Sequence, residues 1–307
     1  MYLGLAAAQV MVLCFFAMSY LGIARHYEKK ASFVSAIREL TMEPVKVKNS
    51  FFKGLMVFLA ILLVIMIFLP ILTIVLLSFV KPGTWMIEIY PREFSLDNYL
   101  KIFSKTRSFM PFANSLKMAL LAALAAVSVA IPTAYITTKT KSRTKPVLEF
   151  LVMLPFAMPA SAIAINMING FSNTLLGTWI LLPLAYFVSM VPLAVRSVTL
   201  SYERLKNEYG EASNNLGASN WQTFSRVTFP LIAPGIWAGL LLVFIRSLGE
   251  YTISAFLYTA SNRPISIAMV NSIFEFEIGL AMAYGALVLA ITFIGAGLIR
   301  NLQSFSK

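Results

Sequence analysis

Long apolar segments, separated by shorter polar ones, dominate the chain. A helix needs roughly 20 apolar residues to cross a bilayer, so uncharged segments of this length predict membrane helices. The segments without a formal charge are Met1–Ala24, Gly54–Val80, Met118–Thr138, Phe150–Val195 and Ile278–Ile299.

Two regions do not match a single uninterrupted membrane helix. Phe150–Val195 is too long for one crossing, and the stretch INGFSNT at 168–174 contains Gly and Asn turn residues. We therefore predict a hairpin of two helices there. A further helix is expected from Pro230 to about Tyr258, interrupted only by Arg246 and Glu250. The pattern thus predicts an all-α membrane protein, a polytopic helical bundle with about seven transmembrane helices.

Composition and charge fit the same class. Hydrophobic residues make up 59% of the 307 residues and charged residues 12%, too few for the surface of a soluble domain. The formal net charge of +12 is explained better by cytoplasmic loops than by a nucleic-acid partner, because such loops collect Lys and Arg. Segment 25–53 holds seven Lys and Arg residues and 259–277 only one. We expect the N-terminus outside and the C-terminus in the cytoplasm, although 81–117 holds six.

The N-terminal part adds one helix to the bundle. Met1–Ala24 has no basic residue before its apolar core, unlike a secretory signal, so we expect an uncleaved transmembrane helix. Residues 25–53 would form a basic cytoplasmic linker. Cys14 is the single cysteine, which excludes an intrachain disulfide, and His26 is the single histidine. Since metal-ligand clusters, a nucleophile–His pair and a phosphate-binding loop are absent from the sequence, we expect no catalytic residue, metal or cofactor in this chain.

A polar stretch between two apolar segments, residues 201–230, is predicted to form a folded module. Ser201–Asn215 is typical of a mostly polar helix, and Gly217 suits the left-handed position that ends a helix. Ser219 and Gln222 have the spacing of a capping box, which predicts a second helix start. The module could insert into a groove on a partner, with Glu211 as a charged contact. The alternative is a helix pair that rests on lipid headgroups.

These residues resemble the EAA motif of ATP-binding-cassette importer permeases. That motif runs Glu-Ala-Ala, three residues, Gly, nine residues, then Ile-x-Leu-Pro. Glu211, Ala212, Gly217 and Pro230 match it, while Ser213 replaces the second Ala. Val227 and Phe229 conservatively replace Ile and Leu, FSLDNYLKIF (94–103) and NSL (114–116) are also similar to the family, and the resemblance covers about residues 52–305.

The resemblance implies a type I permease: a six-helix domain at 54–305 in addition to the N-terminal helix. It implies a bacterial or archaeal cytoplasmic (inner) membrane, a multi-pass chain in contact with lipid, and a coupling loop at 201–230. This loop would dock on a dimer of ATP-binding-cassette ATPases, which bind the ATP and Mg. Glu211 would make the polar contact, and Gly217 would let the two short helices approach closely. The coupling residues would be Glu211, Ala212, Ser213, Gly217, Trp221 and Pro230.

Polar residues within the apolar segments are candidates for the translocation path. Arg246 and Glu250 lie four residues apart, which on one helix places them on a shared face. They either line or gate the path or form a self-neutralising pair that fixes the rotation of the helix. Asn166 and Asn169 follow two prolines that predict a kink. Gly235 and Gly239 predict a close helix–helix approach elsewhere in the bundle.

The remaining expectations concern partners and solute. Met1–Glu28 resembles the last helix of the first half of a fused permease, so we expect a distinct second permease subunit, with a homodimer left open. An external solute-binding protein would deliver the solute. SLGEY (247–251) resembles permeases for ferric iron and polyamines, which makes ferric iron the first choice and leaves polyamines, phosphonates, thiamine and sugars open. The competing hypothesis is an ion-gradient-driven secondary transporter or channel, for which more paired intramembrane acids would be expected.

Overall fold

The computed structural model describes residues 49–84, 91–206 and 208–304, as well as Val12, Phe15, Phe16 and Ser19. The predicted helix Met1–Ala24 and the predicted linker 25–53 therefore lie almost entirely outside the described residues.

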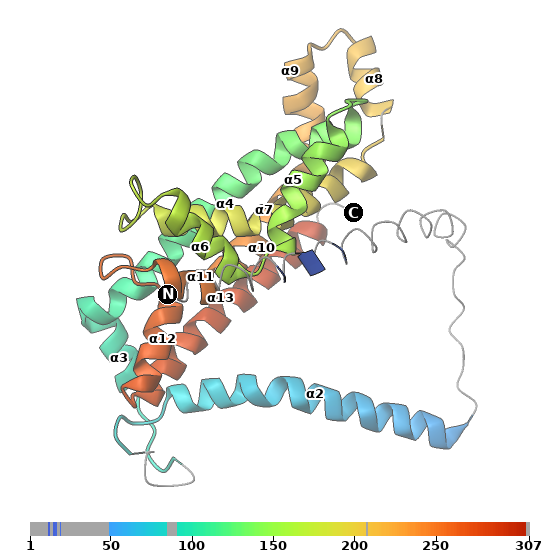
Figure 1. Ribbon diagram of the computed structural model, residues 1–307. Helices are drawn as coiled ribbons and strands as arrows, with labels where there is room; N and C mark the ends of the chain where they lie inside the picture. The colour runs from blue at the N-terminus through green and yellow to red at the C-terminus, as the bar shows by residue number, and fades with distance from the viewer. Residues whose placement is uncertain are drawn as a thin grey trace.

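Throughout these residues the chain is helical, and its only β-bridge joins Val80 to Phe94. This confirms the predicted all-α fold (Figure 1). In chain order the helices are α2 (Ser50–Ser78), α3 (Asp97–Ser104), α4 (Thr106–Lys139), α5 (Lys145–Ala157), α6 (Ala160–Gly170), α7 (Leu181–Arg204), α8 (Glu208–Asn215), α9 (Asn220–Thr223), the π-helical η1 (Phe224–Thr228), α10 (Phe229–Leu248), α11 (Thr252–Leu257), α12 (Ile265–Phe274) and α13 (Ile278–Ser304).

Five helical stretches in the described part are long and apolar enough to cross a membrane, and a sixth span results if α5 and α6 cross together. The five are Ser50–Ser78, Thr106–Lys139, Leu181–Arg204, Asn220–Leu248 and Ile278–Leu298. Each predicted apolar segment from residue 54 onward overlaps one of these helices, and Phe150–Val195 overlaps both the α5–α6 pair and α7. The multi-pass helical bundle is therefore confirmed.

The helix predicted at the start of Phe150–Val195 is broken in two. α5 and α6 meet at an angle of 107° at Met158 and Pro159. A residue before proline is pushed out of the helical region, and Met158 is indeed extended, with φ −97° and ψ 134°. The predicted turn at 168–174 lies later, at 171–180, because α6 continues through Gly170; Gly177 supplies the left-handed residue, with φ +80°.

The core lies where α4, α7 and α10 pack together. The buried face of α4 is rich in alanines, most of them three or four residues apart, so they form a stripe of small side chains. Small residues let helix backbones approach closely in a membrane. The buried alanines of this stripe are Ala119, Ala122, Ala123, Ala126, Ala130 and Ala134.

The predicted close approach at Gly235 and Gly239 is present between α10 and α7. A Cβ atom on Gly235 would lie 2.1 Å from Ser201 Oγ and 2.9 Å from the carbonyl oxygen of Ser197. A Cβ on Gly239 would lie 3.3 Å from the Cβ of Ser197. The Ser197 hydroxyl also donates a hydrogen bond of 2.9 Å to the carbonyl of Gly235. Glycine is thus required at residue 235 for the two helices to pack as they do.

The two ends of the bundle differ. α8 and α9 project from one end, while α3 and α12 lie at the other (Figure 1). α12 lies in 259–277, which the sequence pattern predicts to be only a connecting loop. This expectation was incomplete, because α12 has 10 residues, too few to cross a membrane, and a helix of this length leaves no membrane-span signal in the sequence.

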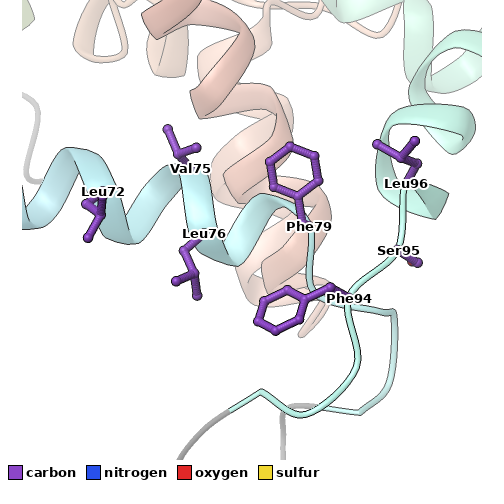
Figure 2. Close-up of a pocket in the computed structure, with 7 residues that line it drawn as sticks. All are labelled: Leu72, Val75, Leu76, Phe79, Phe94, Ser95 and Leu96. Atoms are coloured by element: carbon purple, nitrogen blue, oxygen red, sulfur yellow. The ribbon is translucent and has the colours of Figure 1, made fainter.

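α2 lies apart from the α4–α7–α10 core and meets the rest of the bundle near its C-terminal end (Figure 1). Its buried residues are Leu77 and Ser78. Where α2 ends, a groove of about 600 Å³ opens between the helix and residues 94–96 (Figure 2). Apart from Ser95, its walls are apolar side chains, namely Leu72, Val75, Leu76, Phe79, Phe94 and Leu96.

Candidate functional site

The helix pair α8–α9, with its connecting turn, is the candidate functional site. Glu208 and Glu211 occupy the first turn of α8, where carboxylates favour the positive end of the helix dipole. α8 ends at Asn215, and Gly217 follows it with a φ of +80°, the left-handed conformation predicted for it. The amide of Gly217 donates to the carbonyl of Asn214, and that of Ala218 to the carbonyl of Ser213. This is the Schellman pattern, which satisfies the last carbonyls of a helix.

The predicted capping box opens the second helix. The Gln222 amide donates to Ser219 Oγ at 3.3 Å, and the Ser219 amide donates to Gln222 Oε1 at 2.9 Å. Two otherwise unpaired backbone N–H groups are satisfied in this way. The sequence thus specifies both the end of α8 and the start of α9 by local hydrogen bonding.

Side chains tie the two helices to each other. The hydroxyls of Ser213 and Thr223 lie 2.9 Å apart, and Thr223 Oγ1 also donates to Asn214 Oδ1 at 3.3 Å. Together with the two caps, these bonds join α8, the turn and α9 into one unit. Ser213, which replaces the second Ala of the EAA motif, therefore joins the two helices through a hydrogen bond.

The tip of the pair exposes large apolar side chains beside an acid. Leu216 is 89% exposed and Trp221 72% exposed, and Trp221 stacks at 5.7 Å on Phe224. Glu211 is exposed, and none of the described residues makes an ion pair or a side-chain hydrogen bond with it. Exposed apolar surface of this kind next to polar groups is typical of an interaction site. It offers a partner both an apolar and a charged contact.

The pair is connected to the membrane helices by two different joints. α9, η1 and α10 run on without a break, so Asn220–Leu248 forms one apolar stretch that contains Pro230 in the first turn of α10. On the other side, α7 ends at Arg204 and Leu205 is extended, so Ser201–Asn215 is two helices rather than the single helix predicted. The Lys139 amine, at the end of α4, donates to the Leu205 carbonyl.

The structure changes the explanation of Gly217. The sequence-based expectation was that this glycine lets the two short helices approach closely. A Cβ atom at Gly217 would meet no atom within 4 Å, so close approach does not require the glycine. The positive φ does, because an L-residue in this conformation is strained by roughly 1–2 kcal/mol.

Arg246 and Glu250 do not share a helix, contrary to the prediction. α10 ends at Leu248, and Glu250 lies in the short break before α11. No ion pair joins these two described residues, so they do not form a self-neutralising pair. The four-residue spacing was misleading because the break at 249–251 rotates Glu250 away from the regular helical position.

Glu250 instead holds the start of α11. Its carboxylate accepts the N–H groups of Ile253 at 2.9 Å and Ser254 at 3.1 Å. The Ser254 hydroxyl lies 2.6 Å from that of Tyr186 on α7, and the Ser266 hydroxyl donates to the Glu250 carbonyl at 2.8 Å. Glu250 is therefore the centre of a polar cluster between α7, α11 and α12. Spacing alone gave no signal for this cluster.

The other predicted path residues are dispersed. Arg246 is exposed near the end of α10, and Asn166 and Asn169 are exposed on α6, beyond the bend at Pro159. Residues 49–84, 91–206 and 208–304 contain no group of three or more His, Cys, Asp or Glu residues arranged to hold a metal ion. Five of the predicted coupling residues thus lie in one unit, namely Glu211, Ala212, Ser213, Gly217 and Trp221. The predicted path residues Arg246, Glu250, Asn166 and Asn169 do not lie together.

Comparison with curated proteins finds several relatives. The chain is 27% identical over 276 residues to the probable ABC transporter permease protein y4fN of Sinorhizobium fredii, covering 87% of this chain and 48% of y4fN. The chain thus spans about half the length of that relative. It is 31% identical over 189 residues to the sulfate transport system permease protein CysT of Escherichia coli, covering 56% and 68% of the two chains. It is 32% identical over 219 residues to the spermidine/putrescine permease PotB of the same species, covering 65% and 78%.

Solved structures show the same fold. A bacterial ABC transporter involved in the import of the acidic polysaccharide alginate contains a chain that superposes with a TM-score of 0.68 at 15% identity. The superposition covers 85% of this chain and 99% of the other. Residues 126–305, which include the whole helix pair, match the family described as binding-protein-dependent transport system inner membrane component. The chain belongs to this family of inner membrane transport components.

Proposed function

We propose that this chain is a permease subunit of an ATP-binding-cassette importer. In this proposal it forms part of the solute path and is not itself an enzyme; a partner ATPase dimer binds ATP and Mg and hydrolyses the nucleotide. The observation that carries the proposal is the tied helix pair α8–α9. It presents Leu216, Trp221 and Glu211 to a partner and continues without a break into the membrane stretch Asn220–Leu248.

The continuity of this stretch supports a coupling role. A force applied to α9 acts on α10 directly, and α10 packs against α4 and α7 in the core. Lys139 at the end of α4 holds the other joint, at Leu205. A rigid docking element with connections to several membrane helices is what a hinge or rocking transition requires. In this proposal the helix pair faces the cytoplasm and the α3–α12 end faces outward.

A second permease subunit is the proposed neighbour of α2. The helix carries 29 residues without a formal charge except Lys53, and its apolar side chains lie exposed along most of its length. The groove beside Phe79 and Phe94 extends this apolar surface (Figure 2). We propose a permease partner distinct from this chain, a choice supported by its match to about half of y4fN. Cross-linking through Leu72→Cys in a Cys14→Ser background distinguishes the cases: a product with a different chain is expected, and a self-cross-link would contradict it.

The solute of this chain is proposed from a short motif. The relatives are named for different solutes: CysT for sulfate and PotB for spermidine and putrescine. We keep ferric iron and polyamines as proposals, because SLGEY at 247–251 resembles those permeases. An external solute-binding protein would make the main selection, so its bound ligand would identify the solute.

Gentle affinity purification of this chain from its native membrane, followed by mass spectrometry, tests the assembly. We expect an ATP-binding-cassette ATPase, a second permease and a solute-binding protein in the same preparation. Recovery of the chain alone or as a self-oligomer in several mild detergents would contradict the proposal and favour a gradient-driven transporter.

A further inference from the structure

A polar cavity lies at the end of the bundle opposite the helix pair. It has a volume of about 680 Å³ and opens between the first turns of α4, the segment that follows α11, and α12. α4 has 34 residues, which corresponds to a length of roughly 50 Å. Arg107 at its start lines the cavity, whereas Lys139 at its end contacts Leu205 beside α8. The cavity and the helix pair are thus on opposite sides of the membrane stretch.

The walls of the cavity are held in place by buried side chains. Asn114 Nδ2 donates to the carbonyls of Ser261 and Arg263, at 3.2 and 3.3 Å. Oδ1 of Asn262, which is fully buried, accepts the Thr259 amide at 2.6 Å. Ser115 Oγ, on α4, accepts the Ile265 amide at 2.8 Å. These bonds fix the segment 259–265 to α4, so the cavity is preformed and its polar groups need little reordering on binding.

Two arginines line this cavity and no acid does. Arg107 and Arg263 are its charged lining residues, and Thr259, Ser261 and Asn271 are among its uncharged polar ones. Neither guanidinium has a hydrogen bond or an ion pair with any residue in the described ranges.

Nearby lysines behave differently. Lys101 pairs with Glu277, and Lys81 pairs with Glu93 at 2.6 Å, an interaction that raises the pKa of the Lys81 amine. Glu93 and Glu277 at this end thus pair with lysines, and neither acid forms an ion pair with Arg107 or Arg263. Like charges that share a cavity repel, and an anion between them removes that repulsion. The guanidinium fork also fits a carboxylate or a tetrahedral oxyanion in a bidentate manner.

We propose that this cavity is an oxyanion-binding site, with Arg107 and Arg263 as the charged contacts and Asn271 as a neutral hydrogen-bond donor. Its ligand is either an anionic solute or an acidic side chain of a docked binding protein, both of which present the same carboxylate-type or oxyanion chemistry. These two sources rest on the proposed importer function, whereas the presence of an oxyanion site does not.

Direct binding tests the site without any partner protein. Purified full-length chain in a detergent with an uncharged headgroup is titrated with sulfate by calorimetry, at constant ionic strength maintained with chloride. We expect saturable binding that Arg107→Gln and Arg263→Gln each weaken about 10-fold or more, because each removes charge-assisted hydrogen bonds. Arg143→Gln, in the segment between α4 and α5 at the opposite end, is the matched control and leaves binding unchanged.

One further variant and a stability measurement keep the result interpretable. Arg107→Lys retains the charge but loses the fork, and it is expected to bind with intermediate affinity. The melting temperature without sulfate shows whether each variant is folded. Absence of saturable sulfate binding by the wild-type chain, or equal weakening by Arg143→Gln, would overturn the site.

The assembled transporter then separates the two sources. If a side chain of the binding protein is the anion, Arg107→Gln and Arg263→Gln weaken docking of that protein, and sulfate competes with docking. If the solute is the anion, docking is unchanged and the KM for uptake rises. Variants that lose sulfate binding yet alter neither docking nor uptake would overturn a transport role for the cavity and leave the proposed importer function intact.

Discussion

Single residues define the helix pair through backbone hydrogen bonding rather than through burial. No residue of α8 or α9 is buried, yet the pair is closed by the Schellman turn at Gly217, the Ser219–Gln222 capping box and the Ser213–Thr223 contact. Such local bonds each contribute on the order of 1 kcal/mol. An exposed element that keeps its shape in this way is suited to docking on a partner protein.

Removing the cap should loosen the second helix. Ser219→Ala deletes the oxygen that accepts the Gln222 amide, at a cost of about 1 kcal/mol. We expect hydrogen exchange at the Gln222 amide to accelerate roughly 5-fold. Ser225→Ala is the control, because the Ser225 hydroxyl only bonds back to carbonyls of its own helix. Equal exchange in Ser219→Ala and the wild type would contradict the capping role.

Glu250 should matter for stability as an acceptor. Glu250→Ala leaves the amides of buried Ile253 and Ser254 without their partner, which costs roughly 1–3 kcal/mol. Glu250→Gln keeps an acceptor oxygen and should lose less. Thermal unfolding in detergent measures both variants. If Glu250→Gln is folded like the wild type and still abolishes transport, the carboxylate charge has a role in the path beyond holding α11.

At the scale of elements, the bundle depends on small residues where helices cross. The alanine stripe of α4 and the glycines of α10 let these helices approach α7 closely, and lipid provides no hydrophobic drive that would compensate for poor packing. Packing contacts are thus the main source of cohesion among α4, α7 and α10.

Gly235→Ala tests this packing. The added methyl would meet Ser201 Oγ and the backbone oxygen of Ser197, so α7 and α10 must separate. Overpacking of this kind costs typically 1–3 kcal/mol, and we expect a lower melting temperature. Gly297→Ala is the matched control in α13, where a Cβ meets nothing within 4 Å. Equal melting temperatures for the two variants would show that the approach at Gly235 tolerates a methyl group.

Some elements can be predicted from the sequence and others cannot. The long uncharged segments predict the membrane helices, and local chemistry predicts Gly217 and the capping box, because those signals need only neighbouring residues. The break at 249–251 was missed because the spacing of Arg246 and Glu250 also fits a continuous helix. The cavity arginines could not be linked from sequence, since Arg107 and Arg263 are brought together only by the packing of α4 against the segment after α11.

At the scale of the whole molecule, two chemically different ends are joined by continuous helices. One end carries the helix pair α8–α9, with its apolar and acidic side chains (Figure 1). The other end carries the cavity lined by Arg107 and Arg263. α4 reaches from the cavity to Leu205, and Asn220–Leu248 runs from the capping box to the break at 249–251. Under the proposed function, these two helical stretches are the parts through which ATPase movement reaches the outward side.

The most direct test of this coupling is the ATPase activity of the reconstituted transporter, measured with and without solute-loaded binding protein. The variant is Gly217→Val, because a β-branched residue is strongly disfavoured at φ +80° and the turn between α8 and α9 must distort. Gly210→Ala, on α8 with nothing within 4 Å of the added methyl, is the control. We predict that Gly217→Val loses solute-stimulated ATPase activity and transport while its melting temperature stays close to that of the wild type. Undiminished transport and stimulation in Gly217→Val would contradict the assignment of the helix pair as the coupling element.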